Sequence, residues 1–431
     1  MEASPRLLLR RRFLPLFATQ FLGALNDNLF RTSMVMLVIY GIYRDAAQEA
    51  TFSAIAGGLF ILPFFLLSAL AGQLADATDK ARLIRIIKTA EILIMLVGAL
   101  ALTLQNVPLL LAVLTGMGIH STFFGPIKYA ILPQHLDDHE VLGGTGLVEA
   151  GTYIAILVGI LLGGVLVFER ADGFHAAGAA VAVIGVALVG RWTAGLVPPA
   201  PPQEDHPSAK IDWHIVRASV KLVSGTLHIP RLFLAICAIS FFWAMGAVLA
   251  AQFPPLVKNS LAADQNVATL FLSVFSVGVA IGSVAINRLL GGHVSAKYAP
   301  ASALMMGLFV LDLYRRIRTW PGPAPELRGL TAFLDVPNSW LIVLDLLGVA
   351  IAGGMFVVPL YAFLTTTVAR VETARTIAAN NIVNAGAMVV ATLLLTGAVM
   401  LGVTVADSLL IVAIASIPAA WLGWKLHLAC D

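Results

Sequence analysis

Charge is scarce in this sequence, and so is cysteine. Only 12% of its 431 residues are Asp, Glu, Lys or Arg, 59% are hydrophobic, and the mean hydropathy is +0.90. A soluble globular protein of this length needs a charged surface, so the composition excludes that class. The two cysteines, Cys237 and Cys430, lie far apart and on different expected elements, which argues against a structural disulfide. No Cys and His cluster has metal-ligand spacing, so we expect neither a metal nor a cofactor.

The sequence is instead rich in long apolar runs. About twelve recur, most of roughly 18–28 residues, which is enough to cross about 30 Å of hydrocarbon. The predicted fold class is therefore an all-α membrane protein with twelve transmembrane helices. The expected spans are roughly 13–43, 52–75, 83–105, 108–132, 142–168, 174–197, 229–255, 266–291, 296–314, 338–364, 374–400 and 404–427.

Basic residues are unevenly distributed around these spans. Of the 27 Lys and Arg residues, 19 fall on the side that holds both termini, seven fall on the other side, and Arg31 lies inside a span. Lys and Arg accumulate on the cytoplasmic side of membrane proteins, so both termini are expected in the cytoplasm. Four of the seven exceptions lie in one loop, 315–337.

Residues 198–228 interrupt the pattern of spans. The stretch PPAPPQEDHPSAK is polar and rich in proline, as linkers are. IDWHIVRASVKLVSGTL follows, with apolar residues near helical spacing and Arg217 and Lys221 on the polar side. It predicts an amphipathic helix along the cytoplasmic membrane surface, although a plain linker helix is also compatible. The predicted organisation is a six-helix half (1–197), a cytoplasmic linker with an amphipathic helix (198–228) and a second six-helix half (229–431), which resembles transporters of the major facilitator superfamily.

The loop after the second span carries a motif with a mechanical function. GQLADATDKAR, from Gly72 to Arg82, resembles the signature loop of that superfamily. Gly72 permits close helix contact, Asp76 can cap or pair at a helix end, and Lys80 and Arg82 hold the loop at the surface. We expect a charge latch that opens and closes as the halves move, while an ordinary basic turn is the alternative.

Several segments together resemble one family. They are QFLGALNDNLFR, GQLAD, FFGPIKYAILPQHL, GLVEAGTYIAILVGILLGG and GGMFVVPLYAFL, and they are similar to the bacterial lysophospholipid transporter (LplT) family, including the transporter half of LplT–acyltransferase fusion proteins. The resemblance implies inward flipping of lysophosphatidylethanolamine across the bacterial inner membrane. It also implies a lysophospholipid substrate, surrounding membrane lipids, and a cytoplasmic acyltransferase or acyl-ACP synthetase that reacylates the product.

The resemblance also carries over individual residues. Asp27 comes from the first span, and Lys128 and Glu149 come from the segments of spans 4 and 5. Pro126 and Pro133 are expected to break the helix, Lys128 lies two residues after the first of them, and its charge favours an extension to the headgroups. Glu149 can pair with Lys128 or lie in headgroup water. One departure is in span 7, where Gln252 stands in a stretch without the cation expected to partner the substrate headgroup.

The first span holds the most unusual polar group. Asp27 and Arg31 are four residues apart, so they share a helix face, and Asn26 and Asn28 flank the acid. Charges at mid-membrane are costly and mark functional sites. We hypothesise that Asp27 takes the substrate ammonium and Arg31 the phosphate. A structural pair that locks span 1 to its neighbours is the alternative.

Further polar candidates lie outside the first span. Asn380 and Asn384 share a face of span 11, where amides can bind substrate or join helices. Asp345 is a further candidate, and Asp312 is expected to be hydrated or paired with Arg315 or Arg316. For His120, we favour an interior histidine with satisfied hydrogen bonds over a proton relay. Candidates for an acyl-chain region are Phe60, Phe64, Phe65, Phe241, Phe242 and Trp243.

Three functions are compatible with these residues. The first is a monomeric lysophospholipid flippase. The second is a proton-coupled exporter of drugs or small solutes, which needs a titrating acid such as Asp27 or Glu149. The third is a membrane module that only docks an acyltransferase. No nucleophile–base pair or phosphate-binding loop is recognisable, so an enzyme is not expected, and nothing indicates a nucleic-acid partner.

Overall fold

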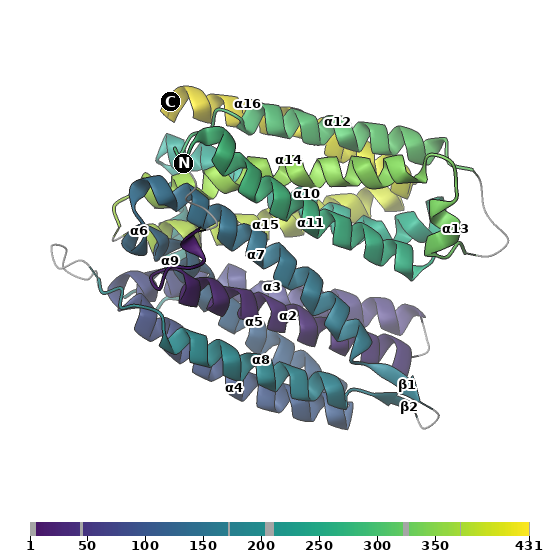
Figure 1. Ribbon diagram of the computed structural model, residues 1–431, viewed down its shortest axis with the longest axis horizontal. Coiled ribbons are helices and arrows are strands. Elements are labelled where there is room, and N and C mark those ends of the chain that lie inside the picture. The colour runs from purple at the N-terminus through teal and green to yellow at the C-terminus, as the bar shows by residue number, and fades with distance from the viewer. Residues whose placement is uncertain are drawn as a thin grey trace. The chain divides into compact units, whose positions relative to one another are not determined.

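The computed structural model describes residues 6–43, 46–170, 173–202, 211–321, 327–370 and 372–430. Almost all of these residues are helical (Figure 1). The twelve long helices are α2 (Leu14–Met36), α3 (Ala46–Ala77), α4 (Lys80–Leu104), α5 (Val107–Ala130), α7 (Asp138–Val165), α8 (Ala177–Gly195), α10 (Pro230–Pro255), α11 (Gln265–Leu290), α12 (Ala299–Arg318), α14 (Ser339–Thr366), α15 (Thr373–Met400) and α16 (Val405–Cys430).

Shorter elements connect these helices. Two π-helices, η1 (Leu37–Ile42) and η2 (Leu256–Ser260), continue the first helix of each expected half, α2 and α10. The remaining short elements are α6 (Leu132–His135), α9 (Ile215–Leu227), α13 (Leu330–Leu334) and the antiparallel hairpin of β1 (Phe168–Arg170) and β2 (Gly173–His175). The hairpin is a small addition to the predicted all-α fold.

Ten of the twelve long helices are long and apolar enough to cross a membrane. The other two, α2 and α12, are long but more polar, because α2 carries Asp27 and Arg31 and α12 ends in Arg315, Arg316 and Arg318. Their positions in chain order complete the predicted set of twelve spans. The predicted all-α membrane fold is therefore confirmed.

Local sequence signals explain where several helices begin and end. The side chain of Asp79 accepts a hydrogen bond from the backbone of Arg82 at the start of α4, and Asn106 does the same for α5. Asp264 caps α11, which ends at Gly291 with a positive φ of 59°. These side chains satisfy amides that a helix start leaves unpaired. Pro126 was expected to break a helix but lies inside α5, so that expectation was wrong.

The chain forms two compact units. Unit 1 contains Met1–Thr226 and Leu364–Ile382, and unit 2 contains Leu227–Phe363 and Val383–Asp431. The first ten residues of α15 therefore belong to unit 1, whereas the rest of that helix belongs to unit 2. The predicted division at 198–228 remains a prediction.

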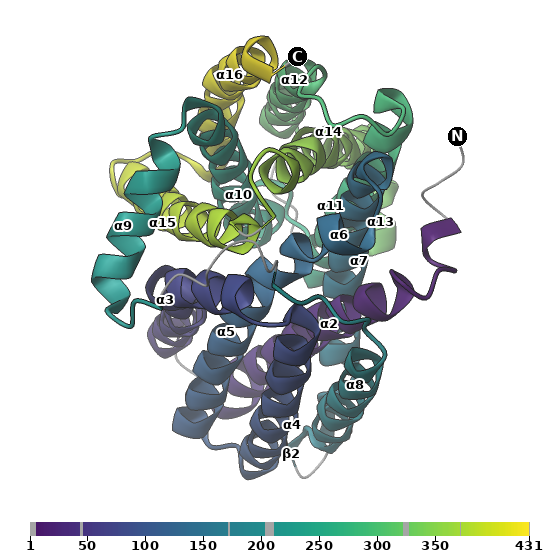
Figure 2. The same ribbon diagram turned by 90° about the vertical axis from the view of Figure 1, so that its left-hand side faces the viewer.

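Within unit 1, α2 is packed chiefly against α7 and α8, and α4 is packed against α8 and α5 (Figure 2). Gly159 and Gly163 let α7 approach the backbone of α2, because a Cβ at these positions would lie 2.6 and 2.8 Å from the carbonyl oxygens of Leu25 and Leu29. The neighbouring Gly164 faces open space instead. This tight packing places α2 in the interior of the unit, where its polar residues meet those of neighbouring helices.

Candidate functional site

The polar residues of α2 point to different neighbours. Asn26 donates a hydrogen bond from Nδ2 to Glu91 Oε1 on α4 at 2.8 Å, and Asp27 Oδ2 accepts one from Ser121 Oγ on α5 at 2.5 Å. Asn28 bonds the carbonyl of Ala24 in its own helix. The Arg31 guanidinium lies 5.8 Å from the centre of the Phe60 ring on α3.

Asp27 and Arg31 do not form the ion pair expected from their spacing. Among the described residues, Asp27 has Ser121 as its hydrogen-bond partner, and no carboxylate lies within ion-pair distance of Arg31. Arg31 is exposed and Asp27 is half-buried. The two charges share a helix face as predicted, but each is directed toward a different neighbouring helix, and this orientation keeps them apart.

A buried charge cluster on α4 and α5 adjoins Asn26, and the sequence pattern did not single it out. Lys88 Nζ lies 2.5 Å from Glu91 Oε2, and His120 Nε2 lies 3.3 Å from the same oxygen. All three side chains are at most 3% exposed. Lys88 had been counted among the cytoplasmic basic residues, and that placement was wrong because its ammonium turns inward to Glu91. A Lys and a Glu three residues apart inside an expected span were the signal that could have revealed this pair.

Several polar atoms of this region have no hydrogen-bond partner among the described residues. They are Asn26 Oδ1, Asp27 Oδ1 and both ring nitrogens of His120. His120 Nε2 nevertheless lies 3.3 Å from Glu91 Oε2, and the His120 ring lies parallel to that of Phe124 with 6.5 Å between the ring centres. Because buried polar atoms normally have partners, these atoms indicate a place where water or a polar ligand binds.

A second buried group links α5 to α7. The Tyr129 hydroxyl donates a hydrogen bond to Glu149 Oε1, and Glu149 Oε2 has no partner among the described residues. Glu149 is 1% exposed, so it does not lie in headgroup water. The Lys128 ammonium lies 4.7 Å from the centre of the Tyr129 ring, and the charges of Glu149 and Asp27 act on it. Lys128 is half-buried beside these groups, contrary to the predicted extension to the headgroups.

Charges balance across this set of residues. Arg31, Lys88 and Lys128 are cationic, whereas Asp27, Glu91 and Glu149 are anionic. The formal charges of these six residues therefore cancel. Such an arrangement suits a ligand that carries both signs, because a zwitterion adds no net charge to a region of low dielectric.

The predicted latch residues lie at the end of α3 and the start of α4. Asp76 accepts backbone hydrogen bonds from Ala374 and Arg375, both at 3.1 Å, and its Oδ2 lies 3.2 Å from Arg375 Nε. It thereby caps the start of α15. Gly72 faces the same helix, since a Cβ there would lie 2.7 Å from that of Ala378.

The two basic residues of the latch motif, Lys80 and Arg82, differ in their relation to Asp76. Lys80 is 1% exposed, and the charges of Asp76 and Asp79 act on it. Arg82 is exposed, and only its backbone amide is engaged, by Asp79. Asp76 therefore contacts the start of α15, and the charge of Lys80 acts on the same carboxylate.

The remaining amide candidates are buried at separate places. Asn380 is fully buried and neither atom of its side-chain amide has a partner among the described residues. In unit 2, Asn384 Oδ1 accepts a hydrogen bond from Ser240 at 2.7 Å, and Gln252 is 6% exposed. Asn384 therefore joins two helices, as the structural alternative predicted, while Asn380 is unengaged.

An ion-pair cluster in unit 2 accounts for two further acids. Arg316 lies 2.6 Å from Asp312 Oδ2 on its own helix and 2.7 Å from Asp345 Oδ2 on α14. Asp312 is thus paired as predicted. Asp345, with a side chain 7% exposed, serves the same cation and joins α12 to α14.

The candidate aromatic residues do not form one lining. Phe60 contacts Arg31, and Phe65 is 50% exposed on the outside of α3. In unit 2, Phe242 fills the space beside Gly353, and Trp243 Nε1 donates a hydrogen bond to the Tyr361 hydroxyl at 2.8 Å. Phe60 is the aromatic residue with a direct contact to a charged candidate.

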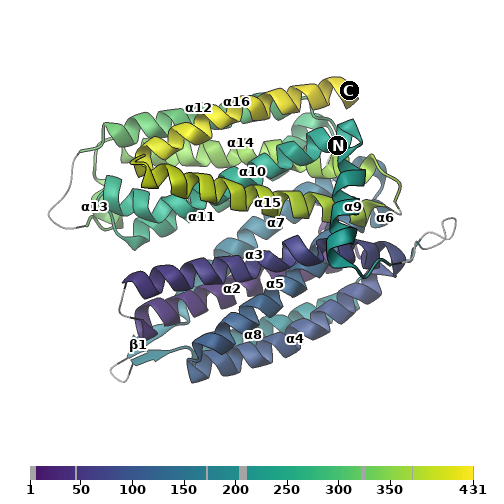
Figure 3. The same ribbon diagram turned by 180° about the vertical axis from the view of Figure 1, so that it is seen from behind.

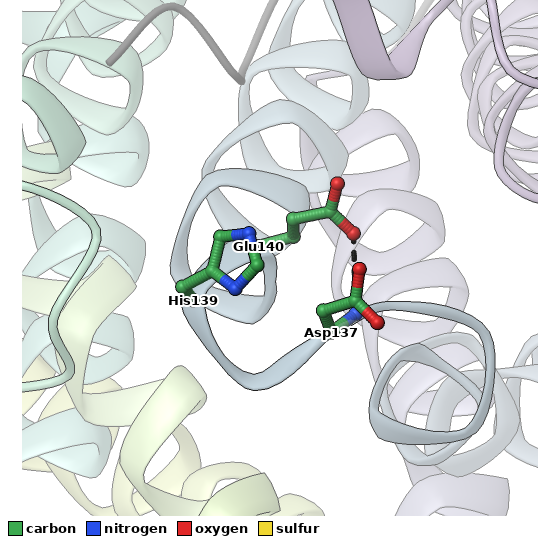
Figure 4. A group of neighbouring side chains, drawn as sticks. All are labelled: Asp137, His139 and Glu140. Carbon is green, nitrogen blue, oxygen red and sulfur yellow. Dashed lines mark hydrogen bonds between the residues drawn. The ribbon is translucent and has the colours of Figure 1, made fainter.

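A small acidic group lies at the start of α7. The ligand atoms of Asp137, His139 and Glu140 lie within 4.8 Å of one another (Figure 4). The Glu140 carboxylate, however, accepts the Asp137 amide in a capping box and lies 3.1 Å from Arg10 and 2.6 Å from Arg12. Two guanidinium groups already neutralise it, so the geometry describes a helix start tied to the N-terminal segment.

The arrangement of twelve long helices is consistent with a membrane transporter fold. The Major Facilitator Superfamily profile matches residues 16–392, and the chain belongs to that family. The human organic anion transporter MFSD10 (TETRAN) has a similar structure, with a TM-score of 0.76, 14% identity and coverage of 96% of this chain and 99% of that one. FucP in its outward conformation matches with a TM-score of 0.72, 13% identity and coverage of 97% and 99%.

Sequence relatives are more specific. The chain is 27% identical over 361 residues to the lysophospholipid transporter LplT of Serratia proteamaculans (strain 568), covering 83% of this chain and 80% of the relative. It is also 27% identical over 403 residues to LplT of Pectobacterium carotovorum subsp. carotovorum (strain PC1), covering 92% and 89%. The predicted resemblance to this group of transporters is thereby confirmed.

Proposed function

We propose that this protein transports lysophospholipids of the lysophosphatidylethanolamine type from the outer to the inner leaflet of the bacterial inner membrane by alternating access. The relatives named as lysophospholipid transporters support the substrate class. The observation that carries the proposal is the balanced set of charges on the helices of unit 1, where Asp27 and Arg31 share a face without pairing with each other.

The headgroup of such a lipid has an ammonium and a phosphate. Asp27 Oδ1 is without a partner among the described residues, so it can accept the ammonium, and the exposed Arg31 guanidinium can bind the phosphate. In this proposal Asn26 is fixed by Glu91 beside the headgroup, and Lys128 and Glu149 provide a second charged pair. Within unit 1, Asn28 and Asn380 remain candidates for contacts with the glycerol part.

Orientation follows from the basic residues of the sequence. Both termini and the latch then lie on the cytoplasmic side, and the latch of Asp76 with the start of α15 opens and closes during transport. The product appears in the inner leaflet, where a cytoplasmic acyltransferase or acyl-ACP synthetase can reacylate it. In this proposal the chain itself acts as a monomer and catalyses no covalent step.

The proposal is tested by uptake of labelled lysophosphatidylethanolamine into proteoliposomes. The intact protein is compared with Asp27→Asn and Arg31→Ala, and with Arg318→Gln as a control on an exposed arginine at the end of α12. We expect uptake by the intact protein and the control, and a loss of at least about tenfold in each site variant, which corresponds to about 1.4 kcal/mol. Normal uptake by both folded site variants contradicts the assigned site, and no uptake by the intact protein contradicts the function.

A proton-coupled exporter is the second candidate. The buried cluster of Lys88, Glu91 and His120 favours it, because ionisable residues inside membrane-spanning helices mark ion and proton pathways. Export that requires a proton gradient, together with indifference to lysophospholipid, supports this candidate over the first.

A further inference from the structure

Helix α9 lies in the segment between the two expected halves and has three distinct faces. One face is buried, with Ala218 4% and Thr226 8% exposed. A second face is apolar and open, with Val216 69% and Val220 64% exposed. Lys221 lies on the third face and is exposed. A helix in a water-filled loop has no physical reason to present two apolar faces.

The buried face of α9 contacts two membrane-spanning helices at once. Ala218, with Leu222 and Val223 beside it, forms a small core with Ala69 of α3 and Ile382 of α15. In addition, the Asp212 amide donates a hydrogen bond to Gln73 Oε1 on α3 at 2.8 Å. Figure 3 shows α9 running across α3 and the start of α15 rather than along them. All of these residues belong to unit 1.

The depth of these contacts can be estimated from helix geometry. Ala69 precedes the end of α3 by eight residues and Ile382 follows the start of α15 by nine, which at 1.5 Å per residue gives about 12 and 14 Å. The headgroup layer of a bilayer is only about 5–8 Å thick on each side. Counted from the helix ends, both contacts therefore lie further in than the thickness of one headgroup layer.

The charges near α9 fit the same position. Arg217 donates two hydrogen bonds to Asp212, at 3.0 and 2.9 Å, so this pair is neutral as a unit. Lys221 provides an exposed cation beside the apolar face. Trp213 precedes the helix and is 69% exposed, and tryptophan is enriched at membrane interfaces.

We propose that α9 is an interfacial strap that lies in the bilayer at the boundary of headgroups and acyl chains. Its open face, Val216 and Val220, contacts the acyl chains, and Lys221 points to the lipid phosphates. Its buried face holds α3 to the start of α15, the two helices that Asp76 also joins. The strap covers the lipid side of this seam. The inference is independent of the transported substrate.

The test is the accessibility of spin labels in the full-length protein, reconstituted in vesicles of phosphatidylethanolamine and phosphatidylglycerol. Single labels are placed through Val216→Cys, Val220→Cys and Lys221→Cys after Cys237→Ser and Cys430→Ser. Val181→Cys on α8, at a residue 73% exposed on a membrane-crossing helix, provides the lipid-facing reference. Collision rates are measured with oxygen, which concentrates in lipid, and with a water-soluble nickel chelate.

We expect the labels at 216 and 220 to resemble the label at 181, with oxygen collisions dominant, and the label at 221 to favour nickel. Dominant nickel collisions at 216 and 220 contradict the strap and make α9 a helix in water. Protection of these two positions from both reagents also contradicts it, because protein rather than lipid then covers the face. Each labelled variant is checked for monodispersity, and since 216 and 220 are already exposed, the substitutions leave the buried core intact.

Discussion

Lys88 and Glu91 form an ion pair within α4, with 2.5 Å between Nζ and Oε2 and almost no solvent exposure on either side. The same carboxylate accepts the Asn26 amide from α2 and lies beside His120 of α5. One carboxylate therefore joins three helices. Because Asn26 directly precedes Asp27, this pair fixes the rotation of α2 and with it the direction in which Asp27 points.

The ion pair predicts an asymmetry between single and double variants. Glu91→Gln leaves the Lys88 ammonium buried without a counter-charge, and Lys88→Met leaves the carboxylate in the same situation. Breaking a buried pair costs roughly 3–5 kcal/mol, whereas replacing both partners is close to neutral. We expect each single variant to lower the melting temperature in detergent strongly and Lys88→Met/Glu91→Gln to recover most of it. Equal stability of all three proteins contradicts a buried pair.

The division of the headgroup between Asp27 and Arg31 predicts a change in lipid preference. Asp27→Asn removes the acceptor for the ammonium, so uptake of lysophosphatidylethanolamine is expected to fall about tenfold. Uptake of a lysophospholipid without an amine is expected to fall much less. Ser121→Ala, which removes the hydrogen bond to Asp27, is expected to have an intermediate effect. Competition between the two lipids in proteoliposomes measures the preference, and equal losses for both lipids argue for a structural role of Asp27.

The cap that Asp76 places on α15 predicts a local effect on that helix. Asp76→Ala removes acceptors for the amides of Ala374 and Arg375, a loss of about 0.5–2 kcal/mol for a helix cap. Hydrogen exchange of residues 373–382 is expected to accelerate while the far end of α15 is unchanged. Asp79→Ala, which uncaps α4 instead, is the matched control. Unchanged exchange at the start of α15 contradicts the cap.

The start of α9 predicts a pH dependence. The Arg217 guanidinium and the His214 amide hydrogen-bond Asp212 and lower the pKa of its carboxyl to about 2, below the ordinary 3.8. Because the folded state favours the carboxylate, this contribution is complete above about pH 4 and is lost as the pH falls through about 2. We expect Trp213 fluorescence, isolated as the difference from Trp213→Phe, to change in this window. Asp212→Asn is expected to abolish that change, and its persistence assigns the transition elsewhere.

The cluster around Arg316 predicts stability effects in unit 2. Arg316→Met leaves Asp345, whose side chain is 7% exposed, without its cation. Asp345→Asn keeps a hydrogen-bond acceptor for Arg316, and Asp312 still neutralises the guanidinium. We therefore expect Arg316→Met to lower the melting temperature clearly and Asp345→Asn to lower it only slightly. The reverse order contradicts the assignment of Arg316 as the shared partner.

The number of spans and most of their limits could be predicted from the sequence. Span length and hydropathy are properties of each helix alone, so they are visible without knowledge of the neighbours. The expected span 229–255 and the helix Pro230–Pro255 differ by one residue at the start. Even α2 could be recognised, because its polar residues are confined to a short part of an apolar run.

Partners of individual side chains could not be predicted in the same way. The spacing of Asp27 and Arg31 indicated a shared face, but helix rotation and the positions of Ser121 and Phe60 determine what each residue contacts. In the sequence, Lys88 is one more basic residue near a membrane surface. In the structure it is buried and pairs with Glu91, which also contacts His120. Contacts of this kind depend on three or four helices together, and single-helix patterns do not contain that information.

The assignment of 364–382 to unit 1 has a consequence for dissecting the protein. A fragment that ends in the linker contains six spans but lacks the segment that Asp76 caps and that Gly72 and Ala69 contact. Expressed by itself, it would present an apolar seam to the bilayer, together with an acid that has lost the amides it caps and the guanidinium of Arg375. The two products of a gene split at the linker should therefore accumulate only when they are made in the same cell.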